Sequence, residues 1–273
     1  METFRTRDGN KVAYYVDDFT DPWLKPDTML LLHPAMSNAR RWFRWVPRLS
    51  RHFRVVRMEF RGHGQSEMLG PNDPFSLGHL VGDALELLDR VDASSAHVVG
   101  YAGGGYAAQQ LAIHHGSRVK SLALYASTPG IKNSNITTWI PKSKERGLRQ
   151  FLADTITDRF DDKADPKMVK WWLDQTGSND PEFISKLFLH MSTHDFMEDL
   201  PKIKCPTLIV APAQEHIGHT GTYHEMQKRI AGSELIQYDT SGHNLGDAYP
   251  DRCVDDLFRF LRKNRLLAAD AVS

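Results

Sequence analysis

Residues Gly100-Tyr101-Ala102-Gly103-Gly104 form the stretch of this chain that most constrains its fold. The segment before it, residues 95–99, is short, apolar and bounded by polar residues, which is typical of a buried strand. The segment after it, residues 105–116, is rich in alanine, has apolar residues at helical spacing and ends in a glycine stop signal. The sequence therefore predicts a strand, a tight glycine-rich turn and a helix.

The two outer glycines of this stretch match a known catalytic motif. In Gly-x-Ser-x-Gly, a serine sits on a sharp strand-to-helix turn that exposes its hydroxyl. A Cβ atom two positions before or after that serine would collide with neighbouring backbone, and Gly100 and Gly104 avoid this collision. Ala102 stands where the motif has serine. The turn therefore has the features of a nucleophile elbow, but a methyl group replaces the attacking oxygen.

Length and composition restrict the class of protein. The 273 residues allow one large α/β domain, or a core with one insertion, and 41% hydrophobic and 25% charged residues are typical of a globular chain. Lys+Arg and Asp+Glu both number 34, so the zero net charge does not favour nucleic acid as a partner. No apolar run approaches the roughly 20 residues that cross a bilayer, so no membrane partner is expected.

The cysteines and the N-terminus bear on the cellular compartment. Cys205 and Cys253 are far apart in the sequence, which favours two free thiols in a reducing compartment over a disulfide framework or a metal site. The first residues lack the apolar segment of a signal peptide. We therefore expect a cytoplasmic protein, and a homodimer is left open.

Strand and helix signals alternate along most of the chain. Apolar or alternating runs predict strands, and apolar residues at helical spacing predict helices. The alternation predicts a mostly parallel sheet with helices on both faces. The expected strands are 4–16 (two pieces joined by a hairpin turn at 8–10), 28–33, 53–60, 95–99, 119–126, 207–211 and 234–238, and the expected helices are 39–49, 75–91, 105–116, 143–160, 166–175, 181–194, 223–231 and 250–261.

Strand signals vanish between residues 129 and 203. This predicts a helical cap at 129–203, inserted into a core formed by residues 1–128 and 204–273. Large side chains in such a cap either pack it onto the core or line an apolar pocket for a small-molecule substrate. The candidates to contact substrate are Trp139, Trp171, Trp172, Phe188, His190 and Met191 in the cap, together with Tyr101 in the turn and His216 after Glu215.

Two residues that follow later strands are candidates for acid–base chemistry. His243 comes after the expected strand 234–238 and Glu215 after the strand 207–211, at the sheet edge where ligands of α/β folds bind. A serine nucleophile needs a base to take its proton and an acid to hold that base in the right tautomer. Ala102, Glu215 and His243 follow one another in the order nucleophile, acid, histidine.

Acyl transfer also needs two backbone N–H groups that stabilise the negative oxygen of the tetrahedral intermediate. One is expected from Gly103, directly after the nucleophile position. The other is expected from the loop that follows His33-Pro34. Because proline has no N–H, Ala35 is the first candidate for that donor and Met36 the second.

Several of these features together resemble the α/β-hydrolase fold superfamily, over nearly the full length of the chain. Among its members the chain is most similar to small hydrolases with a helical cap, such as lactonases, carboxylesterases and C–C bond hydrolases. The shared sequence features are Leu-Leu-Leu-His33-Pro34, Phe60-Arg61-Gly62-His63-Gly64-Gln65-Ser66, the glycine-rich turn, Pro206-Thr207-Leu208-Ile209-Val210 and Gly242-His243.

The resemblance implies an eight-stranded core, a lid formed by the insertion, and a triad at Ala102, Glu215 and His243. The chain departs from the family at Pro34, where glycine is usual, and at Ala102, where serine is usual. The loop that contains Arg61 and His63 is interpreted as structural.

Ala102 admits two interpretations. In the first, serine is the natural residue, and its replacement by alanine leaves an inactive hydrolase that can trap its ligand. The enzyme then cleaves a small, largely apolar ester or lactone, or a C–C bond beside a ketone. In the second, alanine is natural, and the protein binds a ligand without turnover or uses His243 as a base without a cofactor. No cofactor or metal is expected, since His216 and His219 lack a third ligand.

Overall fold

The computed structural model describes residues 1–70, 72–132, 135–215, 217, 220–240 and 242–267. Within these ranges the strands form one eight-stranded sheet in the order β1-β2-β4-β3-β5-β6-β7-β8. β2 is antiparallel to both β1 and β4, and every other neighbouring pair is parallel, as the strand–helix alternation predicted. The strands are β1 (Glu2–Arg5), β2 (Lys11–Asp17), β3 (Thr28–Leu32), β4 (Arg54–Met58), β5 (Ala96–Tyr101), β6 (Val119–Tyr125), β7 (Thr207–Pro212) and β8 (Glu234–Tyr238).

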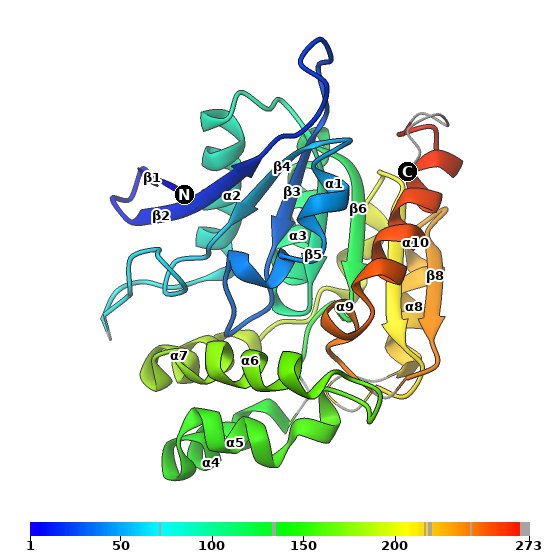
Figure 1. Ribbon diagram of the computed structural model, residues 1–273. Coiled ribbons are helices and arrows are strands. Elements are labelled where there is room, and N and C mark those ends of the chain that lie inside the picture. Colours follow the sequence, from blue (N-terminus) through cyan, green and yellow to red (C-terminus); the bar gives the residue numbers. More distant parts are fainter. Residues whose placement is uncertain (71, 133–134, 216, 218–219, 241, 268–273) are drawn as a thin grey trace.

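Helices cover both faces of this sheet (Figure 1). Side chains alternate along β5, so that Val98 packs in the core under α2, α3 and α8, and Val99 packs in the core under α1, α9 and α10. None of the helices in the described ranges is both long and apolar enough to cross a membrane. The helices around the sheet are η1 (Ala39–Trp42), α1 (Val46–Leu49), α2 (Leu77–Arg90), α3 (Gly103–His114), η2 (Gly116–Arg118), α8 (Thr220–Arg229), α9 (Leu245–Ala248) and α10 (Pro250–Lys263).

The segment between β6 and β7 contributes no strand to the sheet in its described part. Its helices up to residue 191 lie together beyond the carboxyl ends of the parallel strands (Figure 1), whereas its last helix, at 197–202, contacts α3 and α8. We call the whole helical segment the cap. Its helices are η3 (Asn135–Thr138), α4 (Trp139–Arg146), α5 (Leu148–Asp154), η4 (Ile156–Asp158), α6 (Pro166–Gly177), α7 (Pro181–Met191) and η5 (Met197–Lys202).

Two expected helices are broken into shorter pieces. The helix predicted at 143–160 is interrupted at Gly147, whose φ of +78° is a left-handed value that ends a helix. The helix predicted at 39–49 is divided into η1 and α1, because Pro47 lies in the first turn of α1 and starts a new helix. The short helix α9 after His243 was not predicted.

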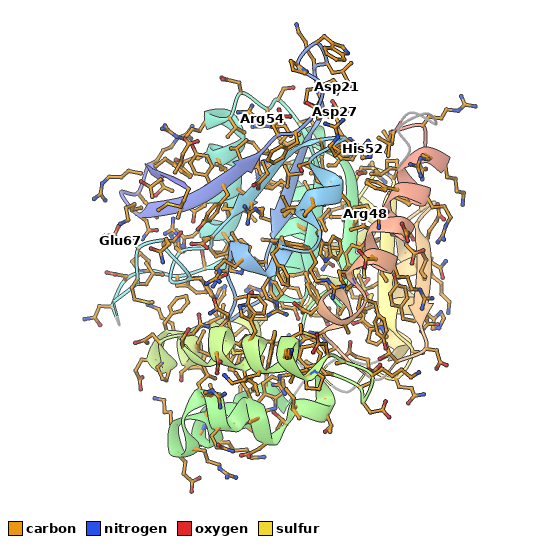
Figure 2. All side chains as sticks on the ribbon, in the orientation of Figure 1. Asp21, Asp27, Arg48, His52, Arg54 and Glu67 are labelled. Atoms are coloured by element: carbon orange, nitrogen blue, oxygen red, sulfur yellow. The ribbon has the colours of Figure 1, made fainter. Side chains whose placement is uncertain are left out.

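The end of the sheet away from the cap is closed by polar contacts. Figure 2 shows Asp27 and Arg54 at this end, beside the start of β3. Arg54 Nη1 donates to the carbonyl oxygen of Val91 at 2.6 Å, and Asp27 pairs with Lys120. The cavity described below lies at the opposite end, under the cap.

The turn between β5 and α3 has the backbone of a strained elbow. Ala102 has φ +45° and ψ −116°, a backbone conformation that residues other than glycine rarely adopt. Its N–H donates to the carbonyl oxygen of Tyr125 at 2.8 Å, and its own carbonyl oxygen accepts a hydrogen bond of 2.9 Å from Ser127 Oγ. The surroundings of the turn therefore hold the strained residue in place.

The glycines of the turn are required by close backbone packing, as the sequence predicted. A Cβ at Gly104 would lie 2.2 Å from the carbonyl oxygen of Leu32 and 2.4 Å from that of His33. A Cβ at Gly100 would lie 2.6 Å from the Cα of Gly105. α3 can begin directly against the end of β3 only because these atoms are absent.

We expect Gly104→Ala to destabilise the fold by about 2 kcal/mol or more, because backbone carbonyls cannot move aside as a flexible side chain can. Gly82→Ala is the matched control, since a Cβ at this position in α2 meets nothing within 4 Å. The control should stabilise the fold by about 0.5–1 kcal/mol. Urea unfolding measures both changes, and equal effects of the two variants would contradict the steric account.

Candidate active site

A mostly apolar cavity lies between the cap and the carboxyl ends of the parallel strands. The turn after β5, the loop after β3, the loop after β8 and the cap all contribute to its wall. Ala102, Gly103 and His243 lie in this wall together, so the structure brings the nucleophile position and the candidate base to one cavity. The other lining residues are Pro34, Ala35, Met36, Arg41, Tyr106, Ala126, Thr128, Ile131, Ile136, Trp139, Arg159, Trp172, Phe188, Met191, Ile217, Tyr223 and Asn244.

The candidate base His243 and the candidate acid Glu215 are in direct contact. His243 Nδ1 lies 3.1 Å from Glu215 Oε1 and 3.2 Å from Oε2. The Glu215 side chain has no exposed surface, whereas that of His243 is 14% exposed. A buried carboxylate on Nδ1 fixes the orientation of the ring and leaves Nε2 free to exchange a proton.

Further donors keep Glu215 ionised. Burial by itself raises the pKa of this carboxyl, but attraction to His243 and its hydrogen bond oppose burial. The N–H of Ile217 donates to Oε1 at 3.0 Å, and the hydroxyl of Tyr223 donates to Oε2 at 2.9 Å. Together these partners lower the pKa of Glu215 from 4.5 to about 2, so that it is a carboxylate at neutral pH.

The loop that carries His243 is held from two sides. On the cap side, the His243 N–H donates to the carbonyl oxygen of Asp158 at 3.4 Å, and the Asn244 N–H donates to that of Arg159 at 2.9 Å. On the core side, the Tyr101 hydroxyl donates to the carbonyl oxygen of His243 at 3.3 Å and accepts from the Gly246 N–H at 3.1 Å. The position of the imidazole therefore depends on both the cap and the sheet.

Two backbone N–H groups near Ala102 fit the expected oxyanion donors. Ala35 and Gly103 are adjacent, because a Cβ at Gly103 would lie 3.0 Å from the backbone nitrogen of Ala35. Neither N–H has a hydrogen-bond partner in the part of the chain that the structure describes. Both residues line the cavity beside the nucleophile position.

Met36, the second candidate for the donor from this loop, is occupied by another contact. Its N–H donates to His63 Nε2 at 3.2 Å. Burial lowers the pKa of His63 to about 4, so the ring stays neutral and able to accept this bond. The prediction of Met36 as a donor is therefore wrong, although its side chain lines the cavity.

The loop with Arg61 and His63 has the structural role that the sequence indicated. The Arg61 guanidinium is buried and forms ion pairs with Asp8 at 2.7 Å and Asp83 at 2.6 Å. These contacts tie the loop to the first hairpin and to α2. His63 in turn fixes the loop after β3, and with it the neighbouring Ala35.

Four of the large cap residues predicted for the pocket line the cavity, namely Trp139, Trp172, Phe188 and Met191. Tyr101 does not, because successive side chains of β5 point to opposite faces and its ring packs against Trp42 on the other side of the sheet. The predicted contact residue His216 lies outside the described residues, as does His219.

Two further predicted contact residues also lie away from the cavity. Trp171 lies on a different side of α6 from Trp172 and packs on Phe43, with the ring centroids 5.2 Å apart. His190 lines a smaller, adjoining hollow, where its Nε2 accepts a 2.8 Å hydrogen bond from the N–H of Leu77. Both side chains join the cap to the core.

Sequence reasoning missed the polar members of the cavity wall. Arg41 and Arg159 both line it, and Tyr223 supports Glu215 from α8. No motif surrounds these residues in the sequence. Their selection requires knowledge of which side of each helix faces the cavity. Within the described ranges, no group of three or more His, Cys, Asp and Glu side chains is placed to hold a metal ion.

The arrangement can accept a proton at His243 Nε2 and can stabilise a negative oxygen between Ala35 and Gly103. The methyl group of Ala102 provides no nucleophile. The mostly apolar wall lowers the local dielectric constant, which strengthens both interactions.

We expect the ionised Glu215 to stabilise the fold above its ordinary pKa of 4.5 by about 3 kcal/mol. Because its pKa is lowered in the folded protein, this stabilisation is lost as the pH falls from about 4.5 toward about 2. Glu215→Gln should remove this part of the pH dependence, and Tyr223→Phe should reduce it by removing one donor. Urea unfolding at a series of acidic pH values tests this, and an unchanged acid-induced loss in Glu215→Gln would contradict it.

Comparison with known proteins finds a matching family model and relatives that are named as hydrolases of ester bonds. A model described as "Alpha/beta hydrolase family" matches residues 29–256. The chain is 27% identical over 227 residues to 3-oxoadipate enol-lactonase 1 of Acinetobacter baylyi, covering 81% of this chain and 83% of the relative. It is 22% identical over 266 residues to the pimeloyl-[acyl-carrier protein] methyl ester esterase of Nitrosospira multiformis, covering 92% and 99%.

Solved structures agree on the fold. The enol-lactonase from Burkholderia xenovorans LB400 superposes with a TM-score of 0.86 at 22% identity, covering 96% of this chain and 100% of that chain. An esterase from Exiguobacterium antarcticum superposes with a TM-score of 0.85 at 18% identity, covering 95% and 98%. With the family model matching most of its length, the chain belongs to the alpha/beta hydrolase family.

Proposed function

We propose that this site is built to hydrolyse a small, largely apolar ester or lactone through a nucleophile at position 102. The observation that carries the proposal is the placement of Ala102, the His243–Glu215 pair and the N–H groups of Ala35 and Gly103. With alanine at position 102, the chain keeps the machinery for binding and proton transfer but lacks the attacking oxygen. This corresponds to the first interpretation of Ala102.

The mechanism follows from the proposed roles of these groups. A serine hydroxyl at position 102 would attack the carbonyl carbon while its proton passes to Nε2 of His243. The N–H groups of Ala35 and Gly103 would stabilise the resulting oxyanion. Collapse of this intermediate breaks the ester bond, and the leaving alkoxide takes the proton from His243. Water, activated by the same imidazole, then releases the acid and restores the serine.

The relatives support the bond type. Their names describe an enol-lactonase and a methyl ester esterase, both of which act on an ester bond. The apolar side chains of Trp139, Phe188 and Met191 in the cavity wall favour an apolar body for the substrate.

We expect Ala102→Ser to raise kcat/KM for its best substrate on the order of 10⁴-fold or more above the Ala102 chain, because it supplies the missing nucleophile. Release of acid from a panel of short methyl esters, p-nitrophenyl esters and γ- and δ-lactones measures the gain. A 1,3-diketone in the same panel tests for C–C bond cleavage.

The matched control is the double variant Ala102→Ser with His243→Ala, which should return to the rate of the Ala102 chain. His243→Ala alone should leave that low rate unchanged. A folded Ala102→Ser protein that is inert toward the whole panel would refute the proposed function.

A second candidate function is base catalysis without a covalent intermediate. The complete support of Glu215 by His243, Ile217 and Tyr223, in a chain without a nucleophile, favours it. In that case the Ala102 chain itself converts a substrate with an acidic C–H or O–H group, and His243→Ala abolishes the conversion. Turnover in the Ala102 chain thus distinguishes this function from acyl transfer.

A further inference from the structure

The cavity wall contains a buried cation that forms no ion pair with a carboxylate of the described residues. Arg159 is 3% exposed and follows η4 in the cap. Its Nη1 donates to the carbonyl oxygen of Thr155 at 2.7 Å and to the Thr155 hydroxyl at 2.6 Å. Among the described residues no carboxylate oxygen lies within 4.0 Å of its guanidinium nitrogens, and Nε and Nη2 have no hydrogen-bond partner.

The other buried arginine of the cavity wall provides a contrast. Arg41 is also nearly inaccessible, but its Nε donates to Asp247 Oδ1 at 2.6 Å and its Nη2 pairs with Oδ2 of the same carboxylate. Its charge is therefore neutralised inside the protein. Arg159 differs from Arg41 in having no such carboxylate.

The surroundings of Arg159 stabilise a cation without neutralising it. Its guanidinium carbon lies 5.4 Å from the ring centroid of Trp139, 5.9 Å from that of Phe151 and 6.0 Å from that of Trp172. Such contacts favour a positive charge over the face of an aromatic ring. Burial nevertheless lowers the pKa of Arg159 to about 10, against a weaker opposing attraction from Asp158. The side chain therefore still carries its charge at neutral pH.

A buried charge without a partner is costly in a folded protein, and a bound anion removes much of that cost. We propose that Arg159 binds an anionic group of the ligand, so that the substrate class is a carboxylate-bearing ester or lactone. Two of its nitrogens, Nε and Nη2, remain for the fork-shaped pairing that guanidinium forms with carboxylate. Trp139 and Trp172 line the same cavity and contact the apolar body of such a ligand.

The position of Arg159 relates the anion to the reacting bond. The carbonyl oxygen of the same residue accepts the N–H of Asn244, next to His243. Arg159, His243 and Ala102 also line one cavity. A ligand anchored by its carboxylate at Arg159 can therefore reach the imidazole and the turn with Ala102 with another part of the same molecule. The inference rests on the proposed function for the identity of the bond, but not for the binding of the anion.

The test is binding by the Ala102 chain, which is not expected to consume the ligand by acyl transfer. Monomethyl succinate, glutarate and adipate are compared with their dimethyl esters by isothermal titration calorimetry. At least one half-ester should bind about 10- to 100-fold more tightly than its dimethyl ester. This affinity ratio corresponds to the free energy of a typical hydrogen bond to a charged group. Arg159→Gln should abolish this preference.

Two further variants separate charge from folding. Arg159→Lys keeps a positive charge without the fork and should retain part of the preference. Arg146→Gln is the matched control, because this α4 arginine is 55% exposed and its removal should leave the preference unchanged. Melting temperatures establish that each variant is folded.

Three outcomes would overturn the inference. The Ala102 chain could bind half-esters and dimethyl esters with equal affinity, or it could bind no half-ester at all. The preference could also persist in folded Arg159→Gln. The outcome is separable from that of the proposed function. Hydrolysis of neutral esters by Ala102→Ser, without any preference for anions, leaves the proposed function standing and rejects the role of Arg159. An Ala102→Ser protein that is inert but still binds half-esters preferentially through Arg159 would reject the proposed function and leave the role of Arg159 standing.

Discussion

The structure depends on the direct contact between the start of α3 and the end of β3. A Cβ at Gly104 would lie 2.2 Å from the carbonyl oxygen of Leu32, so the two elements can meet only through glycine. The contact brings Gly103 beside Ala35 and thereby sets two N–H groups side by side. It also directs the side chain of Ala102 into the cavity. Because Gly104 has no Cβ, α3 can approach β3 closely enough to place Gly103 beside Ala35.

Backbone hydrogen bonds join the cap to the loop that carries the candidate base. Backbone carbonyls of Asp158 and Arg159 accept the N–H groups of His243 and Asn244, so movement of η4 would carry the histidine loop with it. Asp161 strengthens the junction, because its carboxylate accepts from the hydroxyl of Thr240 on the same loop. A ligand bound at Arg159, as proposed, would contact the segment that holds the histidine loop.

The sequence was sufficient for the fold and for pairing Glu215 with His243, but it wrongly offered the Met36 N–H as an oxyanion donor. The elbow glycines and the order Ala102, Glu215, His243 follow from strand–turn–helix rules, and the family and its eight-stranded sheet are confirmed. Contacts that depend on side-chain direction were not predictable. The two neighbours Trp171 and Trp172 point to different sides of α6, and no sequence pattern says which side meets the cavity. Arg159 was missed because its special status, a charge without a carboxylate, exists only after the chain has folded.

The backbone at position 102 bears on how its alanine is interpreted. A residue other than glycine held at φ +45° and ψ −116° costs about 1–3 kcal/mol, and glycine would adopt this conformation with little strain. Ser127 and Tyr125 hold the residue there by hydrogen bonds to its backbone, so the surrounding structure maintains the strain. Such strain is useful when it aims a side chain at a reacting group, and a methyl group has no reaction to perform. The geometry of the turn, together with the hydrogen-bonded pair Glu215 and His243, therefore fits a position made for a nucleophile better than one made for alanine.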